Sequence, residues 1–159
     1  MVKLLSTSCF VGYMPVFPGT TTTFVYTILI FFIFVSFKSS YFFIIPGLAL
    51  IFSVIGIPIS TAAEKIFQKK DPGKVTIDEV AGIFIAFSFL RLEKVKYIGL
   101  LFLGTFAIFR ALDMAKPWFI NSVQRLDGGT GIMLDDIIAG VMTNVLIRLG
   151  YLISFGEVI

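Results

Sequence analysis

The amino-acid sequence predicts an all-α protein, namely a compact polytopic membrane bundle of about five helices, some of them short or re-entrant. Hydrophobic residues account for 57% of the 159 residues and charged residues for only 14%, well below the roughly 25% of soluble chains. Mean hydropathy is +0.98, and apolar runs of near-spanning length follow one another with short polar turns between them. We therefore expect residues 1–159 to form a single integral-membrane helical domain.

The first half of the chain contains one proline-limited apolar segment and two candidate spans. Residues 4–17 are apolar but interrupted by proline, so an interfacial or re-entrant helix is expected there. The turn Pro18-Gly19 ends this segment, and a threonine of Thr20–Thr23 can cap the helix that follows. With those threonines, Phe24–Phe37 approaches the roughly 17–25 residues that a spanning helix needs. Tyr41–Ser60 is long enough on its own.

The second half alternates shorter apolar runs with charged turns. It begins with the first polar stretch of the chain, Glu64–Lys74, and the carboxylates Asp78 and Glu79 then open the third apolar run. Each further run is compatible with a helix, and each is bounded by charged residues. The three runs are Val80–Leu90, Tyr97–Leu112 and Ile137–Phe155.

Charge and residue usage exclude several function classes. The net charge is +3, which is too small in so apolar a chain for a nucleic-acid-binding protein. Scattered lysines beside apolar helices instead favour anionic membrane lipid as a partner. The sequence has no His and a single Cys, Cys9, so a structural disulfide or a cysteine zinc site is excluded. Any metal must be bound by oxygen, which favours a hard cation such as Mg²⁺.

The stretch Gly128–Gly140 combines features that attract both an anion and a cation. Its three leading glycines predict a loop in which a ligand can approach the backbone. The adjacent carboxylates Asp135 and Asp136 follow, at the expected start of a helix whose free N–H groups attract anions. Together these features suggest phosphate and a divalent metal, although a capped helix after an ordinary glycine loop explains this stretch alone equally well.

The expected topology collects the polar motifs on one side of the membrane. If each run from Phe24 onward crosses once, Thr20–Thr23, Asp78/Glu79, Arg110–Lys116 and Gly128–Asp136 share one face. More basic residues lie on that face, which marks it as cytoplasmic. Its basic residues are Lys3, Lys65, Lys69, Lys70, Lys74, Arg110, Lys116 and Arg125, whereas the other face has Lys38, Arg91, Lys94 and Lys96.

Two carboxylates are expected to meet where two helices touch. Glu79 and Gly82 share one helix face, and Asp136 and Gly140 share another. Small residues allow close helix approach, so the carboxylates would lie side by side and need a cation between them.

A third carboxylate lies near basic residues on the fourth run. Arg110 and Asp113 also share a helix face, and Lys116 follows them. The pair is either a local ion pair, or Asp113 is a metal ligand while Arg110 and Lys116 neutralise phosphate oxygens.

Four segments, in order along residues 17–141, resemble the motifs of the phosphatidylglycerophosphatase A family. The chain departs from the family pattern at Thr22 and Thr23, where a Gly-Ser pair usually follows the first motif. The resemblance implies a Mg²⁺-dependent integral membrane phosphatase that hydrolyses the terminal phosphate of phosphatidylglycerophosphate, giving phosphatidylglycerol and inorganic phosphate. The segments are Phe17-Pro18-Gly19-Thr20, Ile77-Asp78-Glu79-Val80-Ala81-Gly82, Phe109–Trp118 and Gly128–Val141.

From the resemblance and the charges together, we expect a bacterial inner-membrane, multi-pass enzyme whose active site faces the cytoplasm. The predicted metal ligands are Asp78, Glu79, Asp113, Asp135 and Asp136. The predicted catalytic residues are Glu79, Asp113, Asp136, Arg110 and Lys116. The predicted phosphate-binding residues are Thr20, Arg110, Lys116, Gly128, Gly129, Thr130 and Gly131.

Two other function classes remain open from the residues. A CDP-alcohol-type lipid phosphotransferase would carry an Asp-Gly-x-x-Ala-Arg signature, whereas Asp127-Gly128 is followed here by Gly129-Thr130-Gly131. A membrane ion or solute carrier would place its carboxylates near mid-membrane, whereas these are expected at one edge.

Overall fold

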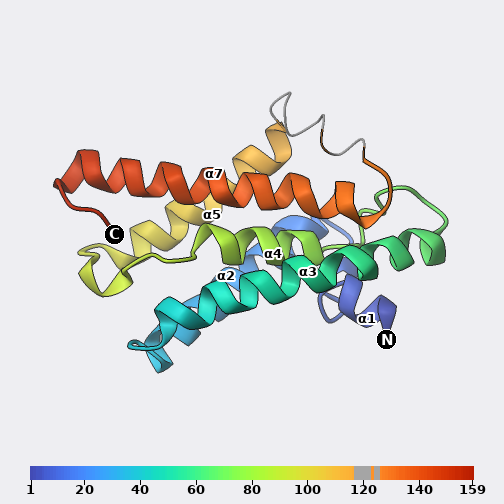
Figure 1. The fold of residues 1–159 in the computed structure, drawn as a ribbon, viewed down its shortest axis with the longest axis horizontal. Helices are drawn as coiled ribbons and strands as arrows, with labels where there is room; N and C mark the ends of the chain where they lie inside the picture. The colour runs from blue at the N-terminus through green and yellow to red at the C-terminus, as the bar shows by residue number, and fades with distance from the viewer. Residues whose placement is uncertain (117–122, 124–125) are drawn as a thin grey trace.

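The computed structural model describes residues 1–116, 123 and 126–159 (Figure 1). Within these residues the chain forms six α-helices and no β-strand, which confirms the predicted all-α class. Pro117, Trp118 and Arg125, which belong to the predicted motifs and charge pattern, lie outside the described residues. The helices are α1 (Val2–Ser6), α2 (Pro18–Ser36), α3 (Tyr41–Phe67), α4 (Ile77–Ala86), α5 (Ile98–Ala115) and α7 (Gly129–Phe155).

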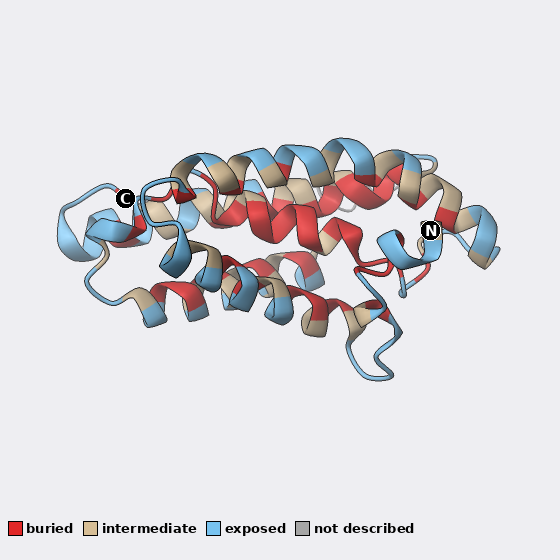
Figure 2. Cartoon of the chain, turned by 90° about the horizontal axis from the view of Figure 1, so that it is seen from below, coloured by how far each residue is buried: buried red, intermediate tan, exposed pale blue. Residues whose placement is uncertain are grey.

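Four of these helices, α2, α3, α5 and α7, are long and apolar enough to cross a membrane. Many of their large hydrophobic side chains are exposed, including Phe43 (74%) and Leu50 (66%) on α3. Exposed apolar area on this scale is rare in soluble monomers and is typical of a surface that contacts lipid. Figure 2 shows the corresponding pattern, with buried residues in the middle of the bundle and exposed residues around it.

The prediction that Val80–Leu90 forms a full span is wrong. The helix here, α4, starts earlier and contains only 10 residues, or about 15 Å at 1.5 Å per residue. That is half of a hydrocarbon core of about 30 Å. The segment is instead the buried centre of the bundle, because nearly every residue of α4 is buried among α2, α3, α5 and α7. A non-helical stretch and the 3₁₀ turn Leu92–Lys94 then continue the path.

The expected helix within residues 4–17 also breaks up. Only Val2–Ser6 is α-helical, and a 3₁₀ turn follows at Val11–Tyr13. Positive φ angles at Ser8, Cys9 and Phe10 interrupt the helix between them. A five-residue helix is too short to cross a bilayer, so this segment packs at one end of the bundle, against α3.

The predicted arrangement of the polar motifs is confirmed. The helices α2, α4 and α7 begin at the same end of the bundle at which α3 and α5 finish (Figure 1). We call this the site end. The opposite end holds the α2–α3 turn, the Leu92–Lys94 turn and the C-terminus (Figure 1).

Close packing of α4 on α7 fixes the centre of the bundle. A Cβ added to Gly140 of α7 would collide with the backbone of Gly82 of α4. A Cβ added to Gly82 would lie 2.6 Å from the Phe109 ring and 2.7 Å from the Asp136 carbonyl oxygen. The two backbones are therefore in direct contact, as the small residues at these positions predict.

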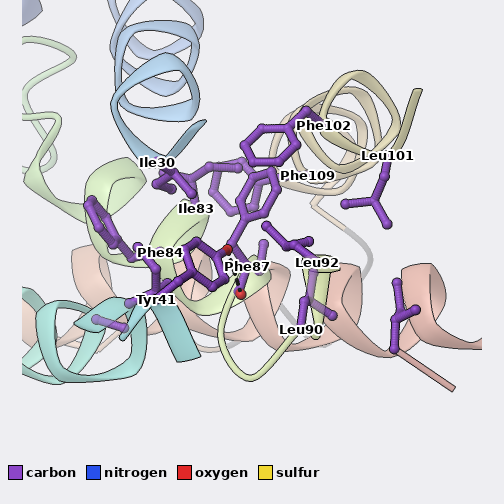
Figure 3. Close-up of a cluster of buried hydrophobic side chains, with 14 of the residues drawn as sticks. Ile30, Tyr41, Ile83, Phe84, Phe87, Leu90, Leu92, Leu101, Phe102 and Phe109 are labelled. Carbon is purple, nitrogen blue, oxygen red and sulfur yellow. Dashed lines mark hydrogen bonds between the residues drawn. The ribbon is translucent and has the colours of Figure 1, made fainter. Parts of the chain in front are cut away.

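Aromatic and aliphatic side chains fill the rest of the core around α4. Phe84 and Phe87 of α4 and its extension meet Phe102 and Phe109 of α5 in this cluster (Figure 3). The Tyr41 hydroxyl donates a hydrogen bond to the Phe87 carbonyl oxygen (3.3 Å), which ties α3 to the end of α4.

The glycine contact predicts a sharp difference between two substitutions in α7. Gly140→Ala should lower the unfolding midpoint, because the new methyl group overlaps the Gly82 backbone and overpacking costs about 1–3 kcal/mol. Gly150→Ala on the same helix has nothing within 4 Å of its added Cβ, so it should leave the midpoint unchanged or raise it. Thermal unfolding of both purified variants in one detergent measures the difference, and equal midpoints would contradict the contact.

Candidate active site

Three carboxylates from two helices converge at the site end of the bundle. Asp78 and Glu79 lie in the first turn of α4, where the helix dipole favours negative charge. Asp136 approaches from α7, one turn before the Gly140 contact. Each residue offers an oxygen within 4.8 Å of the oxygens of the other two. The predicted meeting of Glu79 and Asp136 is therefore confirmed, and Asp78 joins them.

One oxygen of each carboxylate in this cluster has no hydrogen-bond partner in the described part of the chain. Asp78 Oδ1, Glu79 Oε2 and Asp136 Oδ2 are each buried, and none has a hydrogen-bond partner among the described residues. Buried polar atoms are normally paired, because desolvation without a hydrogen bond is costly. The donor set consists of oxygen alone and is anionic, which fits a hard cation such as Mg²⁺.

Two basic side chains flank the cluster, and each is paired with a carboxylate. Arg110 Nη1 lies 2.6 Å from Asp113 Oδ2 and 3.9 Å from Glu79 Oε1. The predicted Arg110–Asp113 pair on one face of α5 is thus present, and it also reaches α4. Arg110 Nε is buried without a partner among the described residues, so this guanidinium retains a free donor.

Lys116 forms the second pair across two helices. It ends α5 in the left-handed conformation (φ 39°), and its Nζ lies 2.6 Å from Asp135 Oδ2 of α7. Burial favours the neutral amine, but the hydrogen bond from Lys116 to Asp135 and the charge of Asp135 outweigh it and raise the pKa of Lys116. Lys116 is therefore a fixed positive charge at neutral pH.

A cavity of about 260 Å³ gives access to the three carboxylates and to Lys116, whereas Arg110 lies behind Asp113 and Glu79, outside the lining. The lining contains five of the predicted site residues: Asp78, Glu79, Asp113, Lys116 and Asp136. It also contains Asp71, Gly73, Val75 and Met114, which the sequence did not single out. The Asp71 backbone N–H donates to Glu64 Oε1 (3.1 Å), which holds the loop after α3 over the cavity. The turn Asp71-Pro72-Gly73 was visible in the sequence, but nothing there connected it to the other motifs.

Around this cavity the carboxylates outnumber the cations. Arg110 and Lys116 are already paired with Asp113 and Asp135. The charges of Asp78, Glu79 and Asp136 therefore have no full counterpart among these groups. Like charges this close are stable only when protons or a further cation compensate them.

Asp135, a further predicted metal ligand, is not part of the group that Asp78, Glu79 and Asp136 form among the described residues. Successive residues of an α-helix point about 100° apart, so Asp135 and Asp136 diverge. Asp136 lines the cavity, whereas Asp135 is outside its lining and pairs with Lys116. Asp135 is placed to position the lysine.

The prediction that the glycines of 128–131 form a loop is wrong, because α7 already begins at Gly129. Only Gly128 has a positive φ (68°), while Gly129, Thr130 and Gly131 form the first turn of α7. The Gly129 N–H donates to Thr61 Oγ1 (2.8 Å), and a Cβ at Gly129 would collide with the Ile57 carbonyl oxygen. These residues let α7 start against α3, and they lie outside the cavity lining. The acidic pair is consequently well inside α7, not in its first turn.

The first motif does reach the site. Gly19 in the first turn of α2 presses on the cluster, because an added Cβ would collide with Glu79 Oε1 and lie 3.3 Å from Arg110 Nη1. Thr20 is the next residue and is half-buried. At the departure from the family pattern, the Thr23 hydroxyl donates to the Gly19 carbonyl oxygen (2.9 Å) and stays within its own helix.

The fold and the site define a class: a polytopic all-α membrane protein with a recessed acidic cavity, flanked by two fixed cations, at one end of its bundle. The family model of phosphatidylglycerophosphatase A matches residues 4–151, and the chain belongs to that family. The resemblance seen in the sequence is confirmed, and the protein is a phospholipid phosphatase.

Two curated relatives align with the chain. A putative phosphatidylinositol-3-phosphatase from Bacteroides thetaiotaomicron is 28% identical over 153 residues, which cover 91% of this chain and 89% of the relative. Phosphatidylglycerophosphatase A from Escherichia coli is 37% identical over 90 residues, which cover 56% of this chain and 50% of the relative. No solved structure matches the chain.

The Lys116–Asp135 pair predicts non-additive mutations. Lys116→Met and Asp135→Asn should each reduce phosphatase activity, because each removes the fixed cation or releases it from its position. The double variant should be little worse than the poorer single variant, since residues acting as one unit are non-additive. Rates for the two single variants and the double variant measure the coupling, with unfolding midpoints as the folding control. Fully multiplicative losses would mean that the two residues act separately.

Proposed function

We propose that the protein is a Mg²⁺-dependent phosphatidylglycerophosphatase, which hydrolyses the terminal phosphate of phosphatidylglycerophosphate to phosphatidylglycerol and inorganic phosphate. Family membership and the Escherichia coli relative support this substrate. The observation that carries the proposal is one cavity lined by three carboxylates with unpaired oxygens and flanked by two fixed cations. A phosphomonoester with its counter-cation has the complementary charges.

Asp78, Glu79 and Asp136 would hold the metal ion, because their unpaired oxygens form one group. When bound, Mg²⁺ supplies charge that stabilises phosphoryl oxygens and lowers the pKa of water. Asp113 also lines the cavity, but one of its oxygens is already committed to Arg110 at 2.6 Å. Its main role here is to orient the guanidinium.

Arg110 and Lys116 would bind the phosphate oxygens. The planar guanidinium can offer two parallel donors to a phosphate, and its Nε is unpaired and buried. Lys116 adds a positive charge whose position Asp135 fixes. Both cations are preorganised in a partly dehydrated site, where interactions with developing charge are strongest.

The position of the site favours a phosphatase over a carrier. The acidic cluster comes from the first turn of α4 and from Asp136 in the first half of α7, at the site end of the bundle. A carrier requires ion-binding groups near the middle of the bilayer.

The site end is proposed to face the cytoplasm. The described basic residues there outnumber those at the opposite end, which are Lys38, Arg91, Lys94, Lys96 and Arg148, whose guanidinium donates to the Phe89 and Ile159 carbonyl oxygens. An excess of lysine and arginine marks the cytoplasmic side of short-looped membrane proteins. The basic residues of the site end are Lys3, Lys65, Lys69, Lys70, Lys74, Arg110 and Lys116.

A second substrate is favoured by one comparison. The Bacteroides relative, named as a phosphatidylinositol-3-phosphatase, aligns over most of both chains. A phosphorylated inositol headgroup presents the same phosphomonoester on a bulkier ring. Family membership and the Escherichia coli relative favour the glycerol headgroup.

Phosphate release by the purified protein separates these possibilities. We expect release from phosphatidylglycerophosphate that requires Mg²⁺ and stops with a chelator, and slower release from phosphatidylinositol 3-phosphate. Faster release from the inositol lipid would replace the proposed substrate. Activity that is unaffected by chelation would remove the metal from the proposal.

Removing the negative charge of one cluster carboxylate should lower the apparent affinity of the enzyme for Mg²⁺. Asp136→Asn and Glu79→Gln keep side-chain volume but lose the anionic oxygen that a hard cation requires. Each should raise the Mg²⁺ concentration for half-maximal rate by more than about tenfold, since even residues behind metal ligands cost about 10–100-fold. The double variant should be little worse than either single one. A folded Asp136→Asn protein with wild-type rate and Mg²⁺ dependence would exclude this residue from the site.

Replacing the guanidinium should reduce rate far more than stability. Arg110→Lys keeps the positive charge but loses the planar guanidinium with its two parallel N–H donors. We therefore expect kcat to fall about a hundredfold, as it does when one fixed hydrogen-bond donor to a transition state is removed. Arg91→Lys, at an exposed position of the opposite end, is the matched control and should retain wild-type activity. Full activity in Arg110→Lys would reduce Arg110 to a structural partner of Asp113.

A further inference from the structure

An apolar groove lies between α2 and α5, and its lining stops one helix turn short of Arg110. It has a volume of about 230 Å³, and its walls come from these two helices alone. The Thr27 hydroxyl donates to the Thr23 carbonyl oxygen (2.7 Å), so the groove presents only carbon to its occupant. The main lining residues are Phe24, Ile28 and Phe31 of α2 and Phe102, Leu103 and Phe106 of α5.

The helix register connects this groove to the site. The Phe24 and Phe106 rings lie 5.9 Å apart, and the Phe31 and Phe102 rings 5.4 Å apart, so the helices run antiparallel. One turn nearer the site end, the same two faces carry Thr20 on α2 and Arg110 on α5. The close approach of Gly19 to Arg110 Nη1 agrees with this register. Each facing stripe is therefore apolar along the groove and polar at the site.

The far end of the groove lies about one leaflet below Thr20. The lined part of α2, from Phe24 to Phe31, advances about 10 Å at 1.5 Å per residue, and the step from Thr20 to Phe31 is about 16 Å. A hydrocarbon core of about 30 Å gives about 15 Å for each leaflet. The groove walls are also open to the surroundings, with Leu103 63% and Phe24 54% exposed.

We propose that the α2–α5 groove binds one acyl chain of the phospholipid substrate and guides its phosphate headgroup to Arg110. The proposal rests on the lipid phosphatase activity proposed above. Three observations support it. The facing surfaces of α2 and α5 are apolar along the groove, and the far end of the groove lies about one leaflet below Thr20. The Arg110 guanidinium follows at the site end, and its positive charge suits an anionic headgroup. Lipid tails and the groove are equally apolar, so the groove contributes position: it holds the headgroup in register with the cluster.

Two neighbouring residues of α2 provide a matched test. Ile28 lines the groove and is 41% exposed, while Leu29 is 43% exposed and lies outside the lining. In Ile28→Trp the indole fills the groove. We expect the ratio of kcat/KM for a long-chain substrate to kcat/KM for its dihexanoyl analogue to fall about tenfold, the lower end of the discrimination that apolar misfit produces. Leu29→Trp should leave this ratio at the wild-type value.

Three results would contradict acyl-chain binding in the groove. Unchanged ratios in both variants would overturn the proposal. Equal losses in both would also overturn it, because they indicate a general effect of tryptophan at the lipid surface. A change of oligomeric state in Ile28→Trp alone would assign the groove to a second copy of the chain instead.

Photolabelling tests the groove without turnover. A phospholipid with a diazirine in mid-chain should label α2 and α5 peptides that line the groove in preference to α3, and excess unlabelled substrate should suppress this labelling. Uniform labelling of all lipid-facing helices would contradict the proposal. If the wild-type protein releases phosphate from neither phosphatidylglycerophosphate nor phosphatidylinositol 3-phosphate, the proposed function fails. The labelling pattern then decides on its own whether the groove binds an acyl chain.

Discussion

The contact between the backbones of Gly82 and Gly140 determines most of what this protein can do. It brings α4 and α7 together so closely that an added methyl group would collide with backbone. Glu79 and Asp136 lie one turn from these glycines toward the site end, so the contact places their carboxylates side by side. Such crowding of like charges in an apolar bundle requires compensation, and Arg110 and Lys116 make their closest ion pairs with Asp113 and Asp135. Because the helix packing places these carboxylates side by side, a bound cation would stabilise the bundle at this point.

The short length of α4 turns this contact into a usable site. With 10 residues the helix occupies only part of the bundle, so both of its ends lie among the spanning helices. Its first turn carries the acidic pair. At its other end the Asn144 amide donates to the carbonyl oxygens of Ala86, the last residue of α4 (2.9 Å), and of Ser88 just beyond it (2.8 Å). Backbone groups at this depth must be satisfied by protein. The Asn144 amide satisfies two carbonyl oxygens at the end of α4 that lies away from the cavity.

The helical class could be predicted from hydropathy, and the gathering of motifs at one end from the alternation of spans and turns. The meeting of Glu79 and Asp136 could be predicted from the small residues one turn away from each carboxylate. The length of α4 was missed, since an apolar run reads alike in a spanning helix and a fully buried one. The roles of Asp135 and Gly129 were missed for another reason. Both depend on long-range partners, Lys116 and Thr61, that no local spacing reveals. Asp71 reaches the cavity only because the loop after α3 folds back over it.

The central claim is that Asp78, Glu79 and Asp136 form one divalent-cation site, and direct metal binding tests it most simply. Purified protein without lipid should bind Mn²⁺ saturably, as seen by loss of the free-ion signal in electron paramagnetic resonance, and Mg²⁺ should compete. Saturating Mg²⁺ should also raise the unfolding midpoint, because a ligand that binds the folded state stabilises it. Both effects should disappear when all three residues are replaced by their amides in a protein that still folds. Undiminished Mn²⁺ binding in that variant, or no binding by the wild-type chain, would contradict the account.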